Sequence, residues 1–110
     1  MAGLVQQERL EDMYKYDEDQ SLEEIKNYID KTYDQHYSKN KFQTTEFLID
    51  AGHGTGFCLG SIMKYSQRYG HKGTPDEWRK DIFKIIHYAI IMLHVHDTTT
   101  EKKNNKRVEK

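Results

Sequence analysis

Cysteine and proline are nearly absent from the sequence, which has one of each among 110 residues. The single cysteine, Cys58, can form neither an internal disulfide nor a cysteine-based zinc site, which suits a reducing compartment. Long apolar runs are also missing, because the longest, Ala89–Val95, is too short to span a bilayer. The N-terminus lacks the apolar stretch of a signal peptide. We therefore expect a soluble cytoplasmic protein without a membrane partner.

No charge sign predominates, because 18 acidic residues balance 17 basic ones and the formal net charge is −1. This balance makes no case for DNA or RNA as a partner. The charges are nonetheless separated along the chain. We expect an acidic flexible segment at residues 1–20, a helical domain at residues 21–97 and a basic disordered tail at residues 98–110. A contact between subunits is an alternative role for the two charged ends.

Apolar residues recur at three- to four-residue spacing in four segments, which predicts an all-α protein. The expected helices cover Leu22–Tyr33, Thr45–Ala51, Phe57–Tyr69 and Pro75 to about His96. Ser21 is the expected N-cap of the first helix, and Thr74 with Glu77 forms a capping box for the last. Strands at Thr45–Ile49 and Ile82–Ile91 are alternatives, although the period near 3.6 favours helix in the second.

The simplest arrangement of these segments is a small antiparallel bundle of about four helices. Apolar residues make up only 35% of the chain, and charged residues make up 32%. A small chain of this composition buries a modest share of its surface, so self-association would add to its core. We therefore expect a homo-oligomer.

The densest cluster of glycines, Gly52–Gly56, precedes the third expected helix and surrounds His53. Glycines let backbone amides approach an anion, and the N-terminus of a helix favours negative charge. The segment therefore resembles a phosphate-binding loop, although it lacks the pattern GxxxxGK[ST] of a P-loop. A plain turn between two helices is the alternative.

Cations recur on one side of the third helix, at Lys64, Arg68 and Lys72, and Tyr65 lies beside them. The last helix adds Arg79, Lys80, Lys84, His87 and Tyr88 off its apolar face. Cations edged by aromatic rings suit a phosphate next to a stacked base. Asp81 can pair with Lys84 or with the cations of the third helix, which would hold their donor groups in place. A solvated charged face is the alternative interpretation.

Six histidines raise the question of a metal site. His94 and His96 diverge on a helix, and His87 shares a face with His94 without an obvious third ligand. The acidic residues lack the paired spacing on two helices that a magnesium site requires. We therefore expect no metal centre.

Four stretches of the sequence together resemble a known family: Gln35–Tyr37, Thr45–Phe47, Gly60–Gly73 and Asp81–Tyr88. They follow the order H-Y, then G-x-x-x-K-Y-x-x-R, then K-G, then D-x-x-K-x-x-x-Y. This order is similar to that of small phage nucleotide-kinase-like proteins, which are named after a phage deoxynucleoside monophosphate kinase without a P-loop. The resemblance covers about residues 34–96. The acidic N-terminal segment, the basic tail and the enlarged glycine loop depart from the family pattern.

The resemblance implies a nucleotide site in a protein of the host cell cytoplasm. It implies that Lys64, Arg68, Lys72 and Lys84 hold phosphate oxygens, while His36, Tyr37, Tyr65 and Tyr88 shape the site. His53 is a further candidate for ligand binding. Candidates for a catalytic general base are His36, His53 and Asp81, of which His36 and Asp81 are the preferred catalytic residues. A nucleoside triphosphate would be the phosphate donor if the protein is a kinase.

Three functions are compatible with these residues. The first is phosphate transfer to a (deoxy)nucleoside monophosphate, which depends mainly on positioning and charge neutralisation. The second is a non-catalytic oligomer that sequesters a nucleotide second messenger of host anti-phage immunity. The third is inhibition of a host protein through the acidic N-terminal segment. The same cations and aromatic rings serve the first two functions, so the sequence does not separate them.

Overall fold

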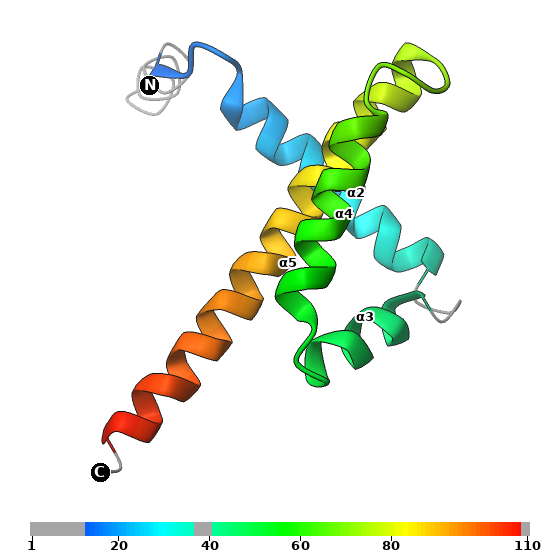
Figure 1. Cartoon of the computed structure of the whole chain (residues 1–110). Coiled ribbons are helices and arrows are strands. Elements are labelled where there is room, and N and C mark those ends of the chain that lie inside the picture. Colours follow the sequence, from blue (N-terminus) through cyan, green and yellow to red (C-terminus); the bar gives the residue numbers. More distant parts are fainter. Residues whose placement is uncertain (1–12, 37–40, 109–110) are drawn as a thin grey trace.

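The computed structural model describes residues 13–36 and 41–108 (Figure 1). Four helices make up this part of the chain, and no strand occurs in it. They are α2 (Glu18–His36), α3 (Lys41–Asp50), α4 (Gly54–Arg68) and α5 (Pro75–Val108). The all-α prediction is therefore confirmed. The two strand alternatives are wrong, because they fall inside α3 and α5. None of the helices in the described ranges combines the length and the apolar character that crossing a bilayer requires.

Helix α2 begins earlier than the sequence predicts, at Glu18 instead of Leu22. Its first turn carries Glu18 and Asp19, whose negative charges suit a helix N-terminus. The Glu18 carboxylate accepts a hydrogen bond from the backbone N–H of Tyr16 at 2.7 Å. Ser21 lies within the helix, where its N–H donates to the carbonyl of Asp17 at 2.9 Å, so the predicted Ser21 cap is wrong. Of the acidic segment expected at residues 1–20, residues 1–12 lie outside the described ranges.

Helix α5 begins where the sequence predicts, with Pro75 as its first residue. The backbone N–H of Glu77 donates to Thr74 Oγ1 at 3.4 Å, which is the expected cap. The helix continues to Val108, so its predicted end near His96 is wrong. No glycine or proline follows Pro75 to stop it, and the Thr98 hydroxyl donates to the carbonyl of His94 at 3.0 Å. The helix therefore extends through most of the segment that was expected to be a disordered tail.

Helices α4 and α5 form an antiparallel hairpin, in which the two helices lie side by side (Figure 1). Gly54 at the start of α4 contacts Val95 far along α5, while Arg68 at the end of α4 contacts Asp81 near the start of α5. Gly70 follows α4 with φ +81°, a backbone conformation that favours glycine and ends the helix as predicted. The antiparallel part of the predicted bundle is thus confirmed for α4 and α5.

Helix α2 crosses this hairpin and packs on α5, and α3 lies to one side between α2 and α4 (Figure 1). The arrangement is open. The radius of gyration of the Cα atoms is 18.0 Å, whereas a compact domain of this length has about 13 Å. The described part of the chain is therefore a crossed helical assembly with a hairpin at its centre, and it is looser than the small bundle that the sequence predicts.

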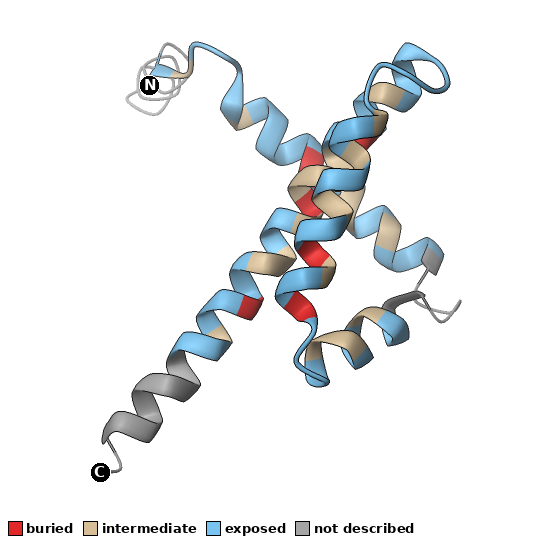
Figure 2. Cartoon of the chain, viewed as in Figure 1, coloured by how far each residue is buried: buried red, intermediate tan, exposed pale blue. Residues whose placement is uncertain are grey.

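The buried side chains lie along the contact between α4 and α5 and where α2 crosses α5 (Figure 2). The buried apolar residues of the described ranges are Ile25 on α2, Cys58 on α4 and Val95 on α5. Cys58 is fully buried, as expected for a small core residue, and burial raises the pKa of its thiol. Two polar side chains, Asp81 and His87, are buried among them. So small an apolar core makes the polar contacts of the hairpin important for its stability.

A buried ion pair of the hairpin joins Arg68 of α4 to Asp81 of α5. Arg68 Nη2 lies 2.5 Å from Asp81 Oδ1, and Arg68 Nε lies 3.3 Å from Asp81 Oδ2, so both carboxylate oxygens accept a hydrogen bond. The Asp81 side chain is 3% exposed. The hydrogen bond from Arg68 lowers the pKa of Asp81, which keeps this carboxyl ionised despite its burial. The sequence-based alternative that Asp81 holds a cation of the third helix in place is confirmed.

Replacing this carboxylate tests whether the ion pair stabilises the hairpin. We expect Asp81→Asn to lower the free energy of unfolding by about 1–3 kcal/mol, because the Arg68 guanidinium loses its charged partner. Urea denaturation followed by circular dichroism measures this change. The matched control is Asp30→Asn, which removes an exposed i,i+4 pair with Lys26 and should cost under about 0.5 kcal/mol. Equal losses of unfolding free energy in the two variants would show that the buried pair stabilises the protein no more than the exposed pair does.

Candidate functional site

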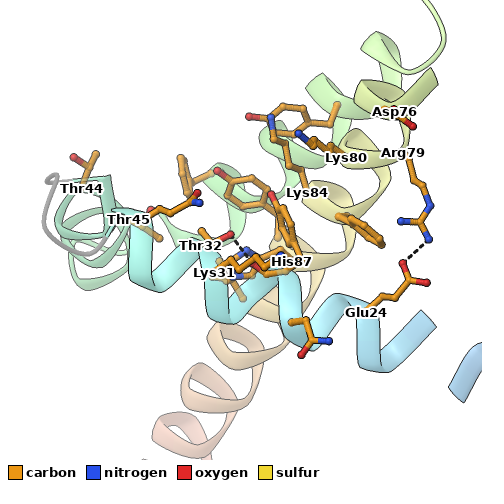
Figure 3. Close-up of a pocket in the computed structure, with 18 residues that line it drawn as sticks. Glu24, Lys31, Thr32, Thr44, Thr45, Asp76, Arg79, Lys80, Lys84 and His87 are labelled. Carbon is orange, nitrogen blue, oxygen red and sulfur yellow. Dashed lines mark hydrogen bonds and ion pairs between the residues drawn. The ribbon is translucent and has the colours of Figure 1, made fainter. Parts of the chain in front are cut away.

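A cavity of about 1200 Å³ opens between α2, α3, α4 and α5 (Figure 3). This volume is somewhat above the range of small-molecule sites, which is about 300–1,000 Å³. Aromatic rings and cations line it, together with uncharged polar side chains of α2 and α3 and two carboxylates. The cavity therefore has the composition that the sequence suggested for a nucleotide site, although only some of the predicted residues form it.

Aromatic rings from three helices form a continuous wall of the cavity. Tyr28 of α2 lies against Phe83 of α5, with ring centroids 5.4 Å apart. His87 lies between Tyr28 and Tyr88, at centroid distances of 6.3 Å and 6.4 Å. Tyr88 in turn stacks on Tyr65 of α4 at 6.0 Å, with only 13° between the ring planes. These five rings, which we call the aromatic wall, give a flat ligand a broad apolar surface.

Cations surround this wall. Lys31, Arg79, Lys80 and Lys84 line the cavity, together with the carboxylates Glu24 and Asp76. Arg79 is held by Glu24, because its Nη2 lies 2.5 Å from Glu24 Oε2 (Figure 3). Lys80 and Lys84 are one helical turn apart, so they project from the same side of α5. These two lysines are the candidate anion-binding pair of the cavity.

Three of the four predicted phosphate-binding cations gather at one ring, that of Tyr65. Arg68 Cζ lies 4.8 Å from the Tyr65 ring centroid, Lys84 Nζ lies at 4.9 Å and Lys64 Nζ lies at 5.4 Å. Each distance is within the range of a cation–π contact. Asp81 neutralises the charge of Arg68, so Lys64 and Lys84 supply the positive charge that attracts an anion here, and Tyr65 connects them to the aromatic wall.

Only part of the predicted ligand-binding set lines the cavity. Tyr65, Lys84 and Tyr88 do so, as the sequence predicts. Arg68 is committed to Asp81 and does not line the cavity, and Lys72 lies in the exposed turn between α4 and α5, because Gly70 ends the helix before it. Lys64 does not line the cavity either. The expectation that the four cations converge on one pocket is therefore met only by Lys84, whereas Lys64 and Arg68 lie at the Tyr65 ring and Lys72 lies in the turn.

The two candidates for a catalytic base have different outcomes. His36 is the last residue of α2, and its side chain lies outside the described residues, as does Tyr37. Asp81 is buried against Arg68 and does not line the cavity. A carboxylate with a lowered pKa in a two-bond ion pair is a weak proton acceptor, so the structure assigns Asp81 a positioning role.

The glycine-rich segment has a structural role at its centre. Helix α4 begins at Gly54, earlier than the predicted Phe57. A Cβ atom at Gly54 would lie 3.0 Å from Val95 Cγ2, so this glycine lets the start of α4 approach α5. Gly52, with φ +89°, makes the turn before it, and His53 is exposed between them and does not line the cavity. These observations favour the alternative of a turn between helices over a phosphate-binding loop.

Some lining residues were not proposed as site residues from the sequence. These are Tyr28, Phe57 and Phe83, whose helical spacing in the sequence is that of ordinary core residues. A local signal exists on α5, where Lys80 and Lys84 alternate with Phe83 and His87 along one side. No local signal joins Tyr28 to Phe83, because these residues meet only when α2 crosses α5.

A sequence profile described as "Protein of unknown function (DUF3310)" matches residues 31–90. The match covers more than half of the chain. The chain belongs to this family. No curated protein and no solved structure matches it. The DUF3310 segment spans α3, α4 and the first half of α5, and it therefore includes Tyr65, Phe83, Lys84 and Tyr88, whereas Tyr28 lies before it.

His87 is the most buried ring of the aromatic wall, with 9% of its surface exposed. Burial lowers the pKa of this imidazole, so it is neutral at physiological pH. Burial also raises the pKa of Tyr28 and Tyr88, and both phenols keep their protons. The wall of this DUF3310 protein is therefore uncharged at neutral pH, while the cations lie at its edge.

The neutral state of His87 makes stability depend on pH. The unfolded chain takes up a proton near pH 6.5, whereas the folded chain takes it up only at lower pH. Stability is therefore complete above about pH 6.5 and is lost as the pH falls below it, by at most about 1.4 kcal/mol per pH unit for one proton. We expect His87→Phe to reduce this slope in urea titrations between pH 5 and 7. The exposed-residue variant His71→Gln should keep the slope, and an unchanged slope in His87→Phe would refute the assignment.

Proposed function

We propose that this DUF3310 protein binds a phosphorylated nucleoside in the cavity between α2 and the α4–α5 hairpin. In this proposal it is a phage protein that acts as a homo-oligomer in the cytoplasm of the host cell. The observation that carries the proposal is the arrangement of one cavity of about 1200 Å³, in which an uncharged aromatic wall adjoins a pair of lysines. The resemblance to phage nucleotide-kinase-like proteins supports the same ligand class.

The aromatic wall suits a nucleobase. Stacking on an aromatic side chain stabilises a bound base by about 1–3 kcal/mol, and this energy depends little on which base it is. Tyr28, Phe83 and His87 offer rings in two orientations, because Tyr28 is tilted by 34° to Phe83 and lies edge-on to His87 at 88°. A base can therefore contact one ring by its face and another by its edge, as aromatic groups prefer.

The lysine pair suits a phosphate. Lys84 Nζ lies 4.9 Å from the centroid of Tyr65, whose ring stacks on Tyr88 of the wall. The positions for phosphate and for base are therefore neighbours, as they are in a nucleotide. Lys80, one turn away on the same side of α5, supplies a second ammonium group to the same region. Two charge-assisted hydrogen bonds to phosphate are stronger than neutral ones and hold it against the wall.

Removing the lysine pair tests the site. We expect the double variant Lys80→Ala/Lys84→Ala to weaken binding of nucleoside monophosphates and triphosphates about 10- to 100-fold, or about 1.4–2.8 kcal/mol. Isothermal titration calorimetry with a panel of ribo- and deoxyribonucleotides measures the change. The control is Lys72→Ala, which removes an exposed cation of the turn and should leave affinity unchanged. Equal losses in both variants, or no binding of any panel member by the wild-type protein, would disprove the proposed site.

Sequestration of the nucleotide without turnover is a second candidate function. The observation that favours it is the ion pair of Asp81, which removes this carboxylate from the set of available bases. For transfer, the candidate base is His87, because its neutral imidazole lines the cavity, and the burial that lowers its pKa makes it a weaker proton acceptor than an exposed histidine. The two functions share the binding site and differ only in the fate of the phosphate.

A direct assay separates transfer from sequestration. The protein is incubated with ATP or GTP and with each deoxynucleoside monophosphate, and the nucleotides are then separated by anion-exchange chromatography. If the site transfers phosphate, we expect deoxynucleoside diphosphates in the wild type and at least a 100-fold lower rate in His87→Phe with binding retained. If the site sequesters, the bound nucleotide is recovered unchanged and no diphosphate forms. The second result would exclude the kinase function for these substrates.

A further inference from the structure

Helix α5 has a second exposed face, opposite to the cavity. Ile82, Ala89, Leu93, His96 and Thr100 follow one another at spacings of seven, four, three and four, so they lie along one side of the helix. At roughly 100° per residue, this side points away from Phe83 and His87, which line the cavity. Ile82 is 41% exposed and Leu93 is 59% exposed. A helix with apolar residues on opposite sides normally has a neighbour on each.

Helix α4 continues the same surface. Leu59 and Met63 are one turn apart on α4 and are 45% and 61% exposed. Between the two helices, a groove of about 730 Å³ is lined by Thr55 and Leu59 of α4 and by Ala89, Met92 and Leu93 of α5, among others. We call the surface formed by Leu59, Met63, Ile82, Ala89 and Leu93 the outer face of the hairpin.

The outer face lacks charge. None of its residues, nor His96 and Thr100 beyond them, is an aspartate, glutamate, lysine or arginine, in a chain of which 32% is charged. In an interface around a two-fold axis, each residue of the face contacts a residue of the same face on the other copy, and residues at the axis meet their own copies. A stripe without charge can therefore be buried on both copies without burying an unpaired charge.

Two glycines on α4 adjoin this face. Gly56 and Gly60 are one turn apart inside the helix, and a Cβ atom at either would meet nothing within 4 Å. Glycine in the middle of a helix is destabilising relative to alanine. Neither the packing of the described residues nor an unusual backbone angle explains their presence. A second helix that approaches the backbone of α4 closely would explain both positions.

We propose that a second copy of this chain packs on the outer face, so that two α4–α5 hairpins form a four-helix core. The extent of the face fits this occupant. From Ile82 to Val95, where α4 lies beside α5, the face is about 20 Å long, and two helices side by side are about 20 Å wide. Burial of this part and of the turn of α5 beyond it removes roughly 900 Å² from water on the two copies, which is the size of a weak, reversible interface.

This proposal names the surface through which the homo-oligomer of the proposed function forms. It does not depend on which ligand the cavity binds. The cavity lies on the opposite side of α5, so it stays accessible when the outer face is covered. Self-association and nucleotide binding can therefore be lost separately. If the protein does not self-associate, the measurement of nucleotide binding still tests the cavity, and the reverse also holds.

Sedimentation velocity on the full chain, from about 1 to 200 μM, tests the interface. We expect the wild type to self-associate and Leu93→Glu to weaken association at least 100-fold, because two carboxylates are then forced into the apolar interface. Met63→Lys is the second variant, with the same expectation. Phe47→Glu is the matched control, because Phe47 is 73% exposed on α3 and lies outside the outer face. Circular dichroism shows whether each variant keeps its helices, and titration with a nucleoside triphosphate shows whether the cavity is intact.

Gly60→Ala adds a test that does not place a charge in the interface. If a partner helix lies close to α4, the added methyl group should weaken association at least fivefold while it raises the melting temperature of the dilute monomer. A monomeric wild type over the whole range overturns the proposal. Association that persists unchanged in both Leu93→Glu and Met63→Lys also overturns it, as does an equal loss in Phe47→Glu.

Discussion

The ion pair between Arg68 and Asp81 fixes the register of the hairpin, and the site depends on that register. Arg68 comes one turn after Tyr65 on α4, and Asp81 comes one turn before Lys84 on α5. Joining the two ends of the pair therefore brings Lys84 over the ring of Tyr65 and lets Tyr88 stack on it. Because few apolar side chains of the described residues are buried, a misplaced hairpin would have little else to restore it. Two residues that the sequence suggested as ligand clamp and catalytic base thus act on the site indirectly, by positioning its wall.

The parts of the fold that depend on neighbouring residues could be predicted. The start of α5 follows from Thr74 and Pro75, and the end of α4 follows from Gly70, because caps and stop signals act within one turn. The end of α5 could not be predicted, because nothing after Pro75 breaks a helix, whereas the polar composition after residue 97 predicts disorder. The crossing of α2 over the hairpin was equally hidden, because no local pattern encodes the angle at which two helices pack.

The same dependence on local patterns explains which residues of the site could be predicted from the sequence. Tyr65, Lys84 and Tyr88 belong to the helices of the hairpin, whose spacing pointed to them, and they line the cavity as expected. Tyr28 reaches the wall from α2 through a contact between distant parts of the chain, and its tyrosine ring looks from the sequence like an ordinary core residue. Lys72 does not line the cavity, and the reason is local. The turn at Gly70 directs the chain away from α4, on which Lys64 and Arg68 lie. Membership of the DUF3310 family locates most of these residues in one matched segment and assigns none of them a role.

Helix α5 unites these features, because one side of it forms the wall and lysine pair of the cavity while the other side forms the outer face. The central claim is that the wall receives a nucleobase. Carbon-13 spectra of the aromatic side chains, recorded during titration with a nucleoside monophosphate, test this claim most directly. The account predicts saturable shifts of the Tyr28, Phe83 and Tyr88 resonances, with the exposed ring of Phe47 unaffected. Shifts centred on His53 and His71, or no shift at millimolar nucleotide, would contradict it.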